Sequence, residues 1–199
     1  TRVPHLKSFQ SFIKKNDNKS LIFKENITID EPVIFPIGFE VSIQPGTIIN
    51  LHEEGSLLIQ GPLLIKGTKE KPVKIFSKDK SMGILVLNSK RRSSLKNVNF
   101  ENLNSPHLSS LNLTGAITFY NSPVDIDNLS FLKSNSEDAL IIVKSDFNII
   151  NSYFENTFSD AIDIDFSNGR IEKSLFSNIG NDAIDTVSYT HLRAHETCV

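Results

Sequence analysis

Residues 137–186 repeat one pattern at intervals of 22 residues. The segment EDALIIVKSDFNIINSYFENTF (137–158) is followed by SDAIDIDFSNGRIEKSLFSNIG (159–180) and then by NDAIDT (181–186). An Asp-Ala pair recurs in register in each copy, at 138–139, 160–161 and 182–183. A fixed period of roughly 20 to 50 residues is the signature of a repeat architecture, in which each unit buries its core only against its neighbours. This period constrains the fold more strongly than any other feature of the sequence.

The spacing and composition of the repeat predict a parallel β-solenoid. Its matching residues fall at i, i+3 and i+5, and the repeat is rich in Ile, Asn, Ser and Phe, which argues against a helical repeat. One coil of three short strands with their turns needs about this many residues, and neighbouring coils hydrogen-bond at about 4.8 Å. We therefore expect residues 25–186 to form an all-β, right-handed parallel β-helix with about 22 residues per coil.

Equivalent residues of successive coils should stack, so the register predicts ladders of like side chains in the interior. Two ladders are expected, one of phenylalanines and one of aliphatic residues: Phe100, Phe131, Phe154 and Phe176, and Leu95, Ile126, Ile149 and Ile171. Stacked aromatic rings stabilise a core beyond the area that they bury. A further register contains Asn97, Asn128 and Asn151, with Lys173 in the next coil; Asn suits a tight turn and its amide can bond along the stack. The longer segment 101–114 should bulge from one corner as a loop.

The N-terminal part of the chain does not follow the repeat. Residues 1–24 are expected to form a separate segment or cap. Within it, Leu6, Phe9, Phe12 and Ile13 are spaced as on a short amphipathic helix.

The C-terminal part also departs from the repeat. The stretch VSYTHLRAHET (187–197) resembles the translation of a sequencing adapter, so we interpret residues 187–199 as a non-native tail and exclude them from fold reasoning. The tail contains two His residues four apart, a Glu and a Cys, a combination that would otherwise suggest a zinc site. We expect instead that the tail neither continues the solenoid nor binds a metal specifically.

Composition excludes several classes of function. The 199-residue chain has a formal charge of −2, from 21 basic and 23 acidic residues, so it has no basic excess of the kind that indicates nucleic-acid binding. No apolar run approaches the roughly 18 residues that a membrane-spanning helix needs. The single Cys rules out an intrachain disulfide framework.

A set of aspartates is the strongest chemical feature. If Ile162 and Ile164 point inward, Asp163 and Asp165 must point outward, because strand side chains alternate. The register also stacks carboxylates of successive coils: Asp182 on Asp160 with Asp138 beneath, and Asp185 on Asp163. Like charges directly opposite one another are destabilising. The repulsion should be offset by a cation, by amides, by a basic residue such as Arg170 or Lys144, or by a raised pKa on one member.

Two interpretations of these aspartates follow from the residues alone. In the first, each Asp accepts backbone N–H bonds at a corner of the coil and has a structural role. In the second, an outward acidic patch binds calcium or polysaccharide through oxygen ligands from two coils. The candidate ligand residues are Asp160, Asp163, Asp165, Asp182 and Asp185.

The upstream segments VSIQPGTIINL (41–51) and GSLLIQGPLLIKGTKEKPVKIFS (55–77) resemble the opening coils of right-handed parallel β-helix proteins, and the later coils resemble their repeats. That family includes pectate lyases, polygalacturonases, alginate epimerases, phage tailspikes and bacterial surface proteins. Most of its members act on, or bind, polysaccharides outside the cell. The resemblance therefore implies a secreted or cell-surface location, a polysaccharide partner and a pectin-lyase-like fold, although a fold alone does not fix a function.

A third interpretation of the aspartates, glycoside hydrolysis, comes from the same resemblance. The spacing is similar to that of polygalacturonases, which implies Asp160 and Asp182 as catalytic residues. An inverting mechanism needs one protonated acid and one carboxylate base around a water molecule. Asn181 occupies the position of a paired acid and cannot act as one, and the family's downstream His-Gly and Arg-x-Lys motifs are not found.

We therefore expect a non-catalytic extracellular or cell-surface solenoid that is associated with polysaccharide. The alternative is a carbohydrate-active enzyme, a polygalacturonase-like hydrolase or a lyase or epimerase, with an acidic site on its outer face. No cofactor is expected, apart from calcium at the aspartates if they bind an ion. A basic corner at 88–94 (NSKRRSS) is expected to be a solvated turn.

Overall fold

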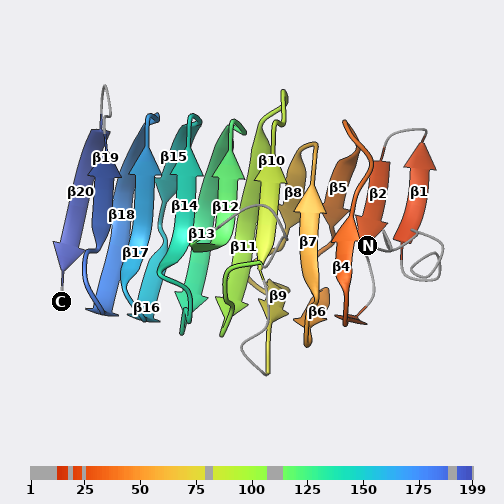
Figure 1. Ribbon diagram of the computed structural model, residues 1–199, viewed down its shortest axis with the longest axis horizontal. Helices are drawn as coiled ribbons and strands as arrows, with labels where there is room; N and C mark the ends of the chain where they lie inside the picture. Colours follow the sequence, from red (N-terminus) through yellow and green to blue (C-terminus); the bar gives the residue numbers. More distant parts are fainter. Residues whose placement is uncertain are drawn as a thin grey trace.

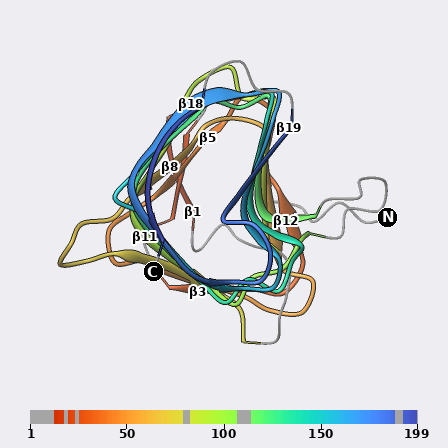
Figure 2. The same cartoon turned by 90° about the vertical axis from the view of Figure 1, so that its left-hand side faces the viewer.

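The chain folds as a parallel β-solenoid of about seven turns. A computed structural model describes residues 13–17, 20–23, 26–78, 83–106, 114–187 and 192–198, and every regular element within these ranges is a β-strand. Figure 1 shows the strands side by side along the long axis of the molecule. Figure 2, a view turned by 90°, shows the coils superposed in a closed and roughly triangular outline. The predicted parallel β-helix is confirmed.

Each coil contributes a strand to each of three faces. The first face is a seven-stranded parallel sheet made of β4 (Pro32–Ile34), β7 (Ser56–Ile59), β10 (Ile84–Leu87), β12 (Gly115–Tyr120), β14 (Asp138–Val143), β17 (Asp160–Asp165) and β19 (Ile184–Val187). The second face contains β2 (Ser20–Phe23), β5 (Glu40–Ile43), β8 (Leu63–Lys66), β15 (Asp146–Ile150) and the first halves of β11 (Ser93–Glu101), β13 (Val124–Leu132) and β18 (Asn168–Ile179). The third face contains β3 (Ile27–Ile29), β6 (Ile48–Leu51), β9 (Val73–Phe76), β16 (Tyr153–Thr157) and the second halves of the same three long strands.

Both predicted interior ladders are present. The strand register pairs Phe100 with Phe131, Phe131 with Phe154 and Phe154 with Phe176, and it pairs the four aliphatic residues in the same order. The ring centroids of Phe131 and Phe154 are 6.2 Å apart with an interplanar angle of 14°, and those of Phe154 and Phe176 are 5.3 Å apart at 10°. All eight ladder side chains are buried. Stacking of equivalent residues therefore forms the core.

The corners are turned by single residues with left-handed backbone. Their φ angles lie between 46° and 59°, and they form three columns: Asn88, Asn121, Lys144 and Phe166; Asn97, Asn128, Asn151 and Lys173; and Asn102, Lys133, Asn156 and Asn178. The second column is the predicted Asn register, and Asn128 Nδ2 donates to Asn97 Oδ1 at 2.7 Å. Asn tolerates this conformation better than other residues with a Cβ atom, which explains why it recurs. The other two columns were not predicted.

A ladder of buried serines satisfies the backbone just after the first corner. Ser145 Oγ accepts the backbone N–H of Ser122 at 2.7 Å and donates to the carbonyl of Val143 at 2.8 Å. Ser167 repeats this arrangement one coil later, because its Oγ accepts the N–H of Ser145. The serine hydroxyls thus replace the backbone hydrogen bonds between strands that the turn interrupts. Such replacement is needed because buried backbone N–H and C=O groups must have hydrogen-bond partners.

Only part of the predicted N-terminal helix can be compared with the structure. Residues 4–12 lie outside the described residues, whereas β1 (Ile13–Asp17) is a strand that pairs antiparallel with β2. The described end of that segment is therefore extended, because the edge of β2 offers backbone partners that a short isolated helix lacks. The predicted loop at 101–114 joins β11 to β12, and its residues 107–113 lie outside the described ones.

The prediction that the tail would not continue the solenoid is wrong. The backbone of β20 (Leu192–Cys198) pairs parallel with β18, and the register places Ala194 next to Ile171 and Cys198 next to Phe176. The open edge of β18 carries N–H and C=O groups that a strand of many different sequences can satisfy. Because this pairing uses the backbone, the non-native origin of residues 187–199 stays a prediction.

Candidate functional site

The predicted aspartates lie along the end of the first face that contains β14, β17 and β19. Ile162 and Ile164 are fully buried, and the alternation along β17 turns Asp163 and Asp165 outward, as predicted. The register pairs Asp160 with Asp138 and Asp163 with Asp185. The structure therefore brings together carboxylates from three successive coils.

Asp160 has the structural contact expected of a turn residue. Its side chain is 8% exposed, and its Oδ1 accepts the backbone N–H of Asp182 at 2.8 Å. The N–H of Ala161 in turn donates to the carbonyl of Asp182 at 3.0 Å. Asp160 and Asp182, the residues implied as catalytic by the polygalacturonase resemblance, thus take part in a bond that holds two coils together.

Asp163 is the most electrostatically perturbed member of the set. Burial, followed by the charge of Asp165 and of the other neighbouring aspartates, raises the pKa of Asp163 to about 7. Burial also raises the pKa of Asp138 to about 6 and raises the pKa of Asp165. The Oδ1 atoms of Asp163 and Asp165 are buried without a hydrogen-bond partner. A raised pKa, one of the four predicted ways to relieve repulsion, therefore operates here.

The two basic residues named as possible partners of the aspartates interact elsewhere. Arg170 contacts Asn148 and Glu172 on the second face, and Lys144 Nζ lies 5.6 Å from the centroid of the Tyr120 ring. In the described part of the chain, no group of three or more His, Cys, Asp and Glu side chains is placed to hold a metal ion. No helix in that part is long and apolar enough to span a membrane.

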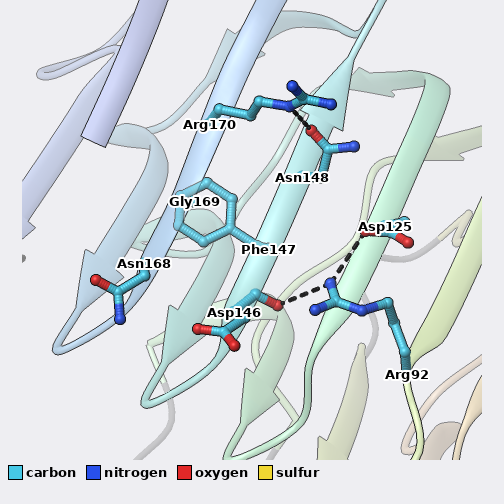
Figure 3. Close-up of a pocket in the computed structure, with 8 residues that line it drawn as sticks. All are labelled: Arg92, Asp125, Asp146, Phe147, Asn148, Asn168, Gly169 and Arg170. Atoms are coloured by element: carbon cyan, nitrogen blue, oxygen red, sulfur yellow. Dashed lines mark hydrogen bonds and ion pairs between the residues drawn. The ribbon is translucent and has the colours of Figure 1, made fainter. Parts of the chain in front are cut away.

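A groove with a mostly polar lining lies on the second face. It has a volume of about 530 Å³ and crosses four successive coils, those of β11, β13, β15 and β18. Its lining residues are Arg92, Asp125, Asp146, Phe147, Asn148, Asn168, Gly169 and Arg170. Figure 3 shows Arg170 and Asn148 on one side, Asp146 and Asn168 on the other, and Arg92 with Asp125 at the far end.

The ring of Phe147 is buried in the core beside the groove, and its position depends on a glycine. The ring of Phe147 lies over Gly169, its neighbour in the strand register (Figure 3). A Cβ atom at position 169 would lie 2.6 Å from Cγ and Cδ1 of Phe147 and 2.4 Å from its carbonyl oxygen. Gly169 is therefore required for the ring to occupy this position, since such contacts are shorter than van der Waals packing allows.

The walls of the groove are held by bonds between coils. Arg92 Nη1 donates to Asp125 Oδ1 at 3.0 Å and to the carbonyl of Asp146 at 3.3 Å. Arg170 Nε donates to Asn148 Oδ1 at 2.5 Å. These contacts fix long side chains across strands, so part of the ordering cost of ligand binding is already met.

This groove was not predicted from the sequence. Residues 88–94 were expected to form a solvated turn, yet Arg92 in that stretch lines the groove. The 22-residue register could have indicated the rest, because Asp125, Asn148 and Arg170 are equivalent positions on β13, β15 and β18. Ladders are recognised in a sequence by residues of the same type at equivalent positions. These three positions carry different residue types, so their equivalence was not noticed.

No protein-family model, no curated protein and no solved structure matched the chain.

Proposed function

We propose that the protein is a non-catalytic, extracellular or cell-surface solenoid that binds polysaccharide through the groove on its second face. The observation that carries the proposal is the lining of that groove. Carboxylate, amide and guanidinium groups from four successive coils line it, while the ring of Phe147 is buried in the core beside it. Sugars present many hydroxyl groups, which donate hydrogen bonds to carboxylate and amide oxygens and accept them from amide and guanidinium N–H groups.

The repeat of the fold supports a polymer as the ligand. Neighbouring coils are about 4.8 Å apart, which is close to the length of one sugar residue in an extended chain. A linear glycan that follows the solenoid axis would therefore meet an equivalent outward position at each step, such as Asp125, Asn148 and Arg170. The parallel β-helix architecture, which resembles that of polysaccharide-binding proteins, is consistent with the same function.

Affinity electrophoresis of the full chain in gels that contain soluble polysaccharides tests this proposal. We expect at least one polysaccharide to retard the protein, and Asn148→Ala together with Arg170→Ala to abolish the retardation. The double substitution Asn50→Ala and Lys74→Ala, on the third face, is the matched control and should leave the retardation unchanged. Absence of retardation across neutral and acidic polysaccharides would reject the proposal.

A second candidate function is glycoside hydrolysis on the first face, and the pKa of Asp163 favours it. A carboxyl with a pKa of about 7 is protonated in a large share of molecules at neutral pH, as a general acid must be. Asp185, stacked on Asp163 in the register, supplies a second carboxyl group. This assignment moves the acid from Asp160, which bonds to backbone, to Asp163.

Release of reducing ends from polygalacturonate and alginate decides between the two functions. An enzyme should release them at a rate that Asp163→Asn lowers by about 100-fold or more, the usual contribution of a general acid. A non-catalytic solenoid should release none above the level of Asp163→Asn. Release that persists unchanged in this variant would point to a contaminating enzyme and reject the second candidate.

A further inference from the structure

We infer that the groove on the second face selects a neutral, hydroxyl-rich glycan and discriminates against polymers of uronic acids; the inference rests on the proposed polysaccharide-binding function. The charges of the lining carry it. Two arginines and two aspartates line the groove, so these charges sum to zero. A site for a carboxylated polymer would need a cationic group that is available to each anionic sugar.

Both arginines already have acidic partners. Arg92 Nη1 lies 3.0 Å from Asp125 Oδ1 and also donates to the backbone carbonyls of Val124 and Asp146. Arg170 Nη1 lies 3.6 Å from Glu172 Oε1, while its Nε is bonded to Asn148. A uronate would have to compete with these carboxylates for the same guanidinium groups, and it would gain only the difference between two similar ion pairs.

Asp146 is one of the two lining aspartates, and it differs from Asp125 in having no ionic partner among the described residues. Its residue is exposed, and among the residues that the structure describes no side-chain hydrogen bond or ion pair involves its carboxylate. In Figure 3 the carboxylate lies on the side of the groove opposite Arg170. It would repel an anionic sugar bound in the groove, because like charges at short range destabilise each other.

The same groups suit sugar hydroxyls. An ionised carboxylate accepts hydrogen bonds from hydroxyl groups, and these charge-assisted bonds are roughly twice as strong as neutral ones. The Asn148 amide, whose oxygen accepts from Arg170, keeps its NH₂ group for donation to a sugar oxygen.

The sign of the effect of Asp146→Asn separates the two ligand classes. We propose isothermal titration calorimetry of the full chain and of this variant with a neutral β-glucan, a neutral galactomannan and polygalacturonate. We expect binding to a neutral polymer and a weakening of about tenfold in Asp146→Asn, the size expected for loss of a hydrogen bond to a charged group. Glu31→Gln, a charge removal at an exposed position of the opposite end, should leave the affinity unchanged.

The remaining outcomes distinguish the inference from the function on which it rests. Binding of polygalacturonate that Asp146→Asn strengthens would overturn the inference and retain the proposed function. Neutral-glycan binding that Asp146→Asn leaves unchanged would also overturn the inference. Failure of every polymer to bind, with circular dichroism showing folded protein, would overturn the proposed function itself.

Discussion

The interior Phe ladder and the outer aspartate rows occupy the same coils and obey the same register, yet their energies have opposite signs. Phe154 stacks on Phe176 with ring centroids 5.3 Å apart. Asp163 pairs with Asp185 in the same 22-residue step. Stacked rings attract each other and bury apolar area, whereas stacked carboxylates repel. A solenoid therefore repeats, from coil to coil, whatever interaction a side chain has with the equivalent residue of the next coil.

The two sets also differ in whether a repulsion between stacked side chains has to be offset. The Phe ladder needs no compensation, because its members are buried and satisfied by one another. The aspartates rely on two devices, a backbone bond to Asp160 and a pKa of about 7 on Asp163. Burial thus leaves a proton on one acid of a crowded row, and three substitutions test this comparison.

Truncation of the central ladder ring should have the largest effect. Phe131 lies between Phe100 and Phe154 and is fully buried, so Phe131→Ala removes contacts on both sides and leaves a cavity. The unfolding free energy should fall by about 3–5 kcal/mol, measured by urea denaturation. Phe158→Ala, at a ring that is 73% exposed, is the control and should change it little. A loss below about 1 kcal/mol for Phe131→Ala would mean that the ladder is not the core.

Neutralising Asp163 should stabilise the protein in a pH-dependent way. Its pKa is about 7 in the fold and about 3.9 in an unfolded chain, so the folded carboxyl holds a proton that the unfolded one loses. This contribution to stability is fully present below about pH 4 and is lost as the pH rises to about 7. Asp163→Asn should therefore raise the Tm at pH 7.5 by about 2–4 °C, the shift expected for about 1 kcal/mol.

Differential scanning calorimetry between pH 4.5 and 8 measures that effect. The gain in Asp163→Asn should shrink toward pH 4.5, where the wild-type carboxyl is also neutral. Glu31→Gln removes a charge at an exposed position and controls for net charge. An equal Tm gain at both ends of the pH range would show that the substitution acts through packing and not through the proton.

The smallest effect is expected at a corner. Phe166 has a φ of 50° in a column where two other coils have Asn, and its side chain is 56% exposed. Phe166→Asn should relieve left-handed strain and raise the unfolding free energy by less than about 1 kcal/mol. Phe158→Asn makes the same chemical change at a residue without positive φ and should bring no gain. Equal effects of the two substitutions in urea denaturation would assign the change to solubility or surface composition.

Much of the fold was predictable because the repeat encodes it locally. The step of 22 residues fixed the register, and the register placed Phe131 on Phe154 and Asp163 outward on Asp185. The candidate sites were less predictable. The aspartate positions were found, but the groove joins dissimilar residues such as Arg92 and Asn148, which no repetition links.

The sequence by itself determined the coil length, the interior ladders and the alternation of inward Ile with outward Asp, since a parallel solenoid brings each residue next to its counterpart one period away. Only the tertiary structure decided which carboxyl keeps its proton, because burial of Asp163 depends on neighbours from other coils. It also decided that Lys144 and Phe166 could turn a corner where Asn is preferred, since the hydrogen bonds of adjacent coils impose the backbone conformation. The groove likewise exists only once four coils are stacked, because each coil contributes a part of its lining.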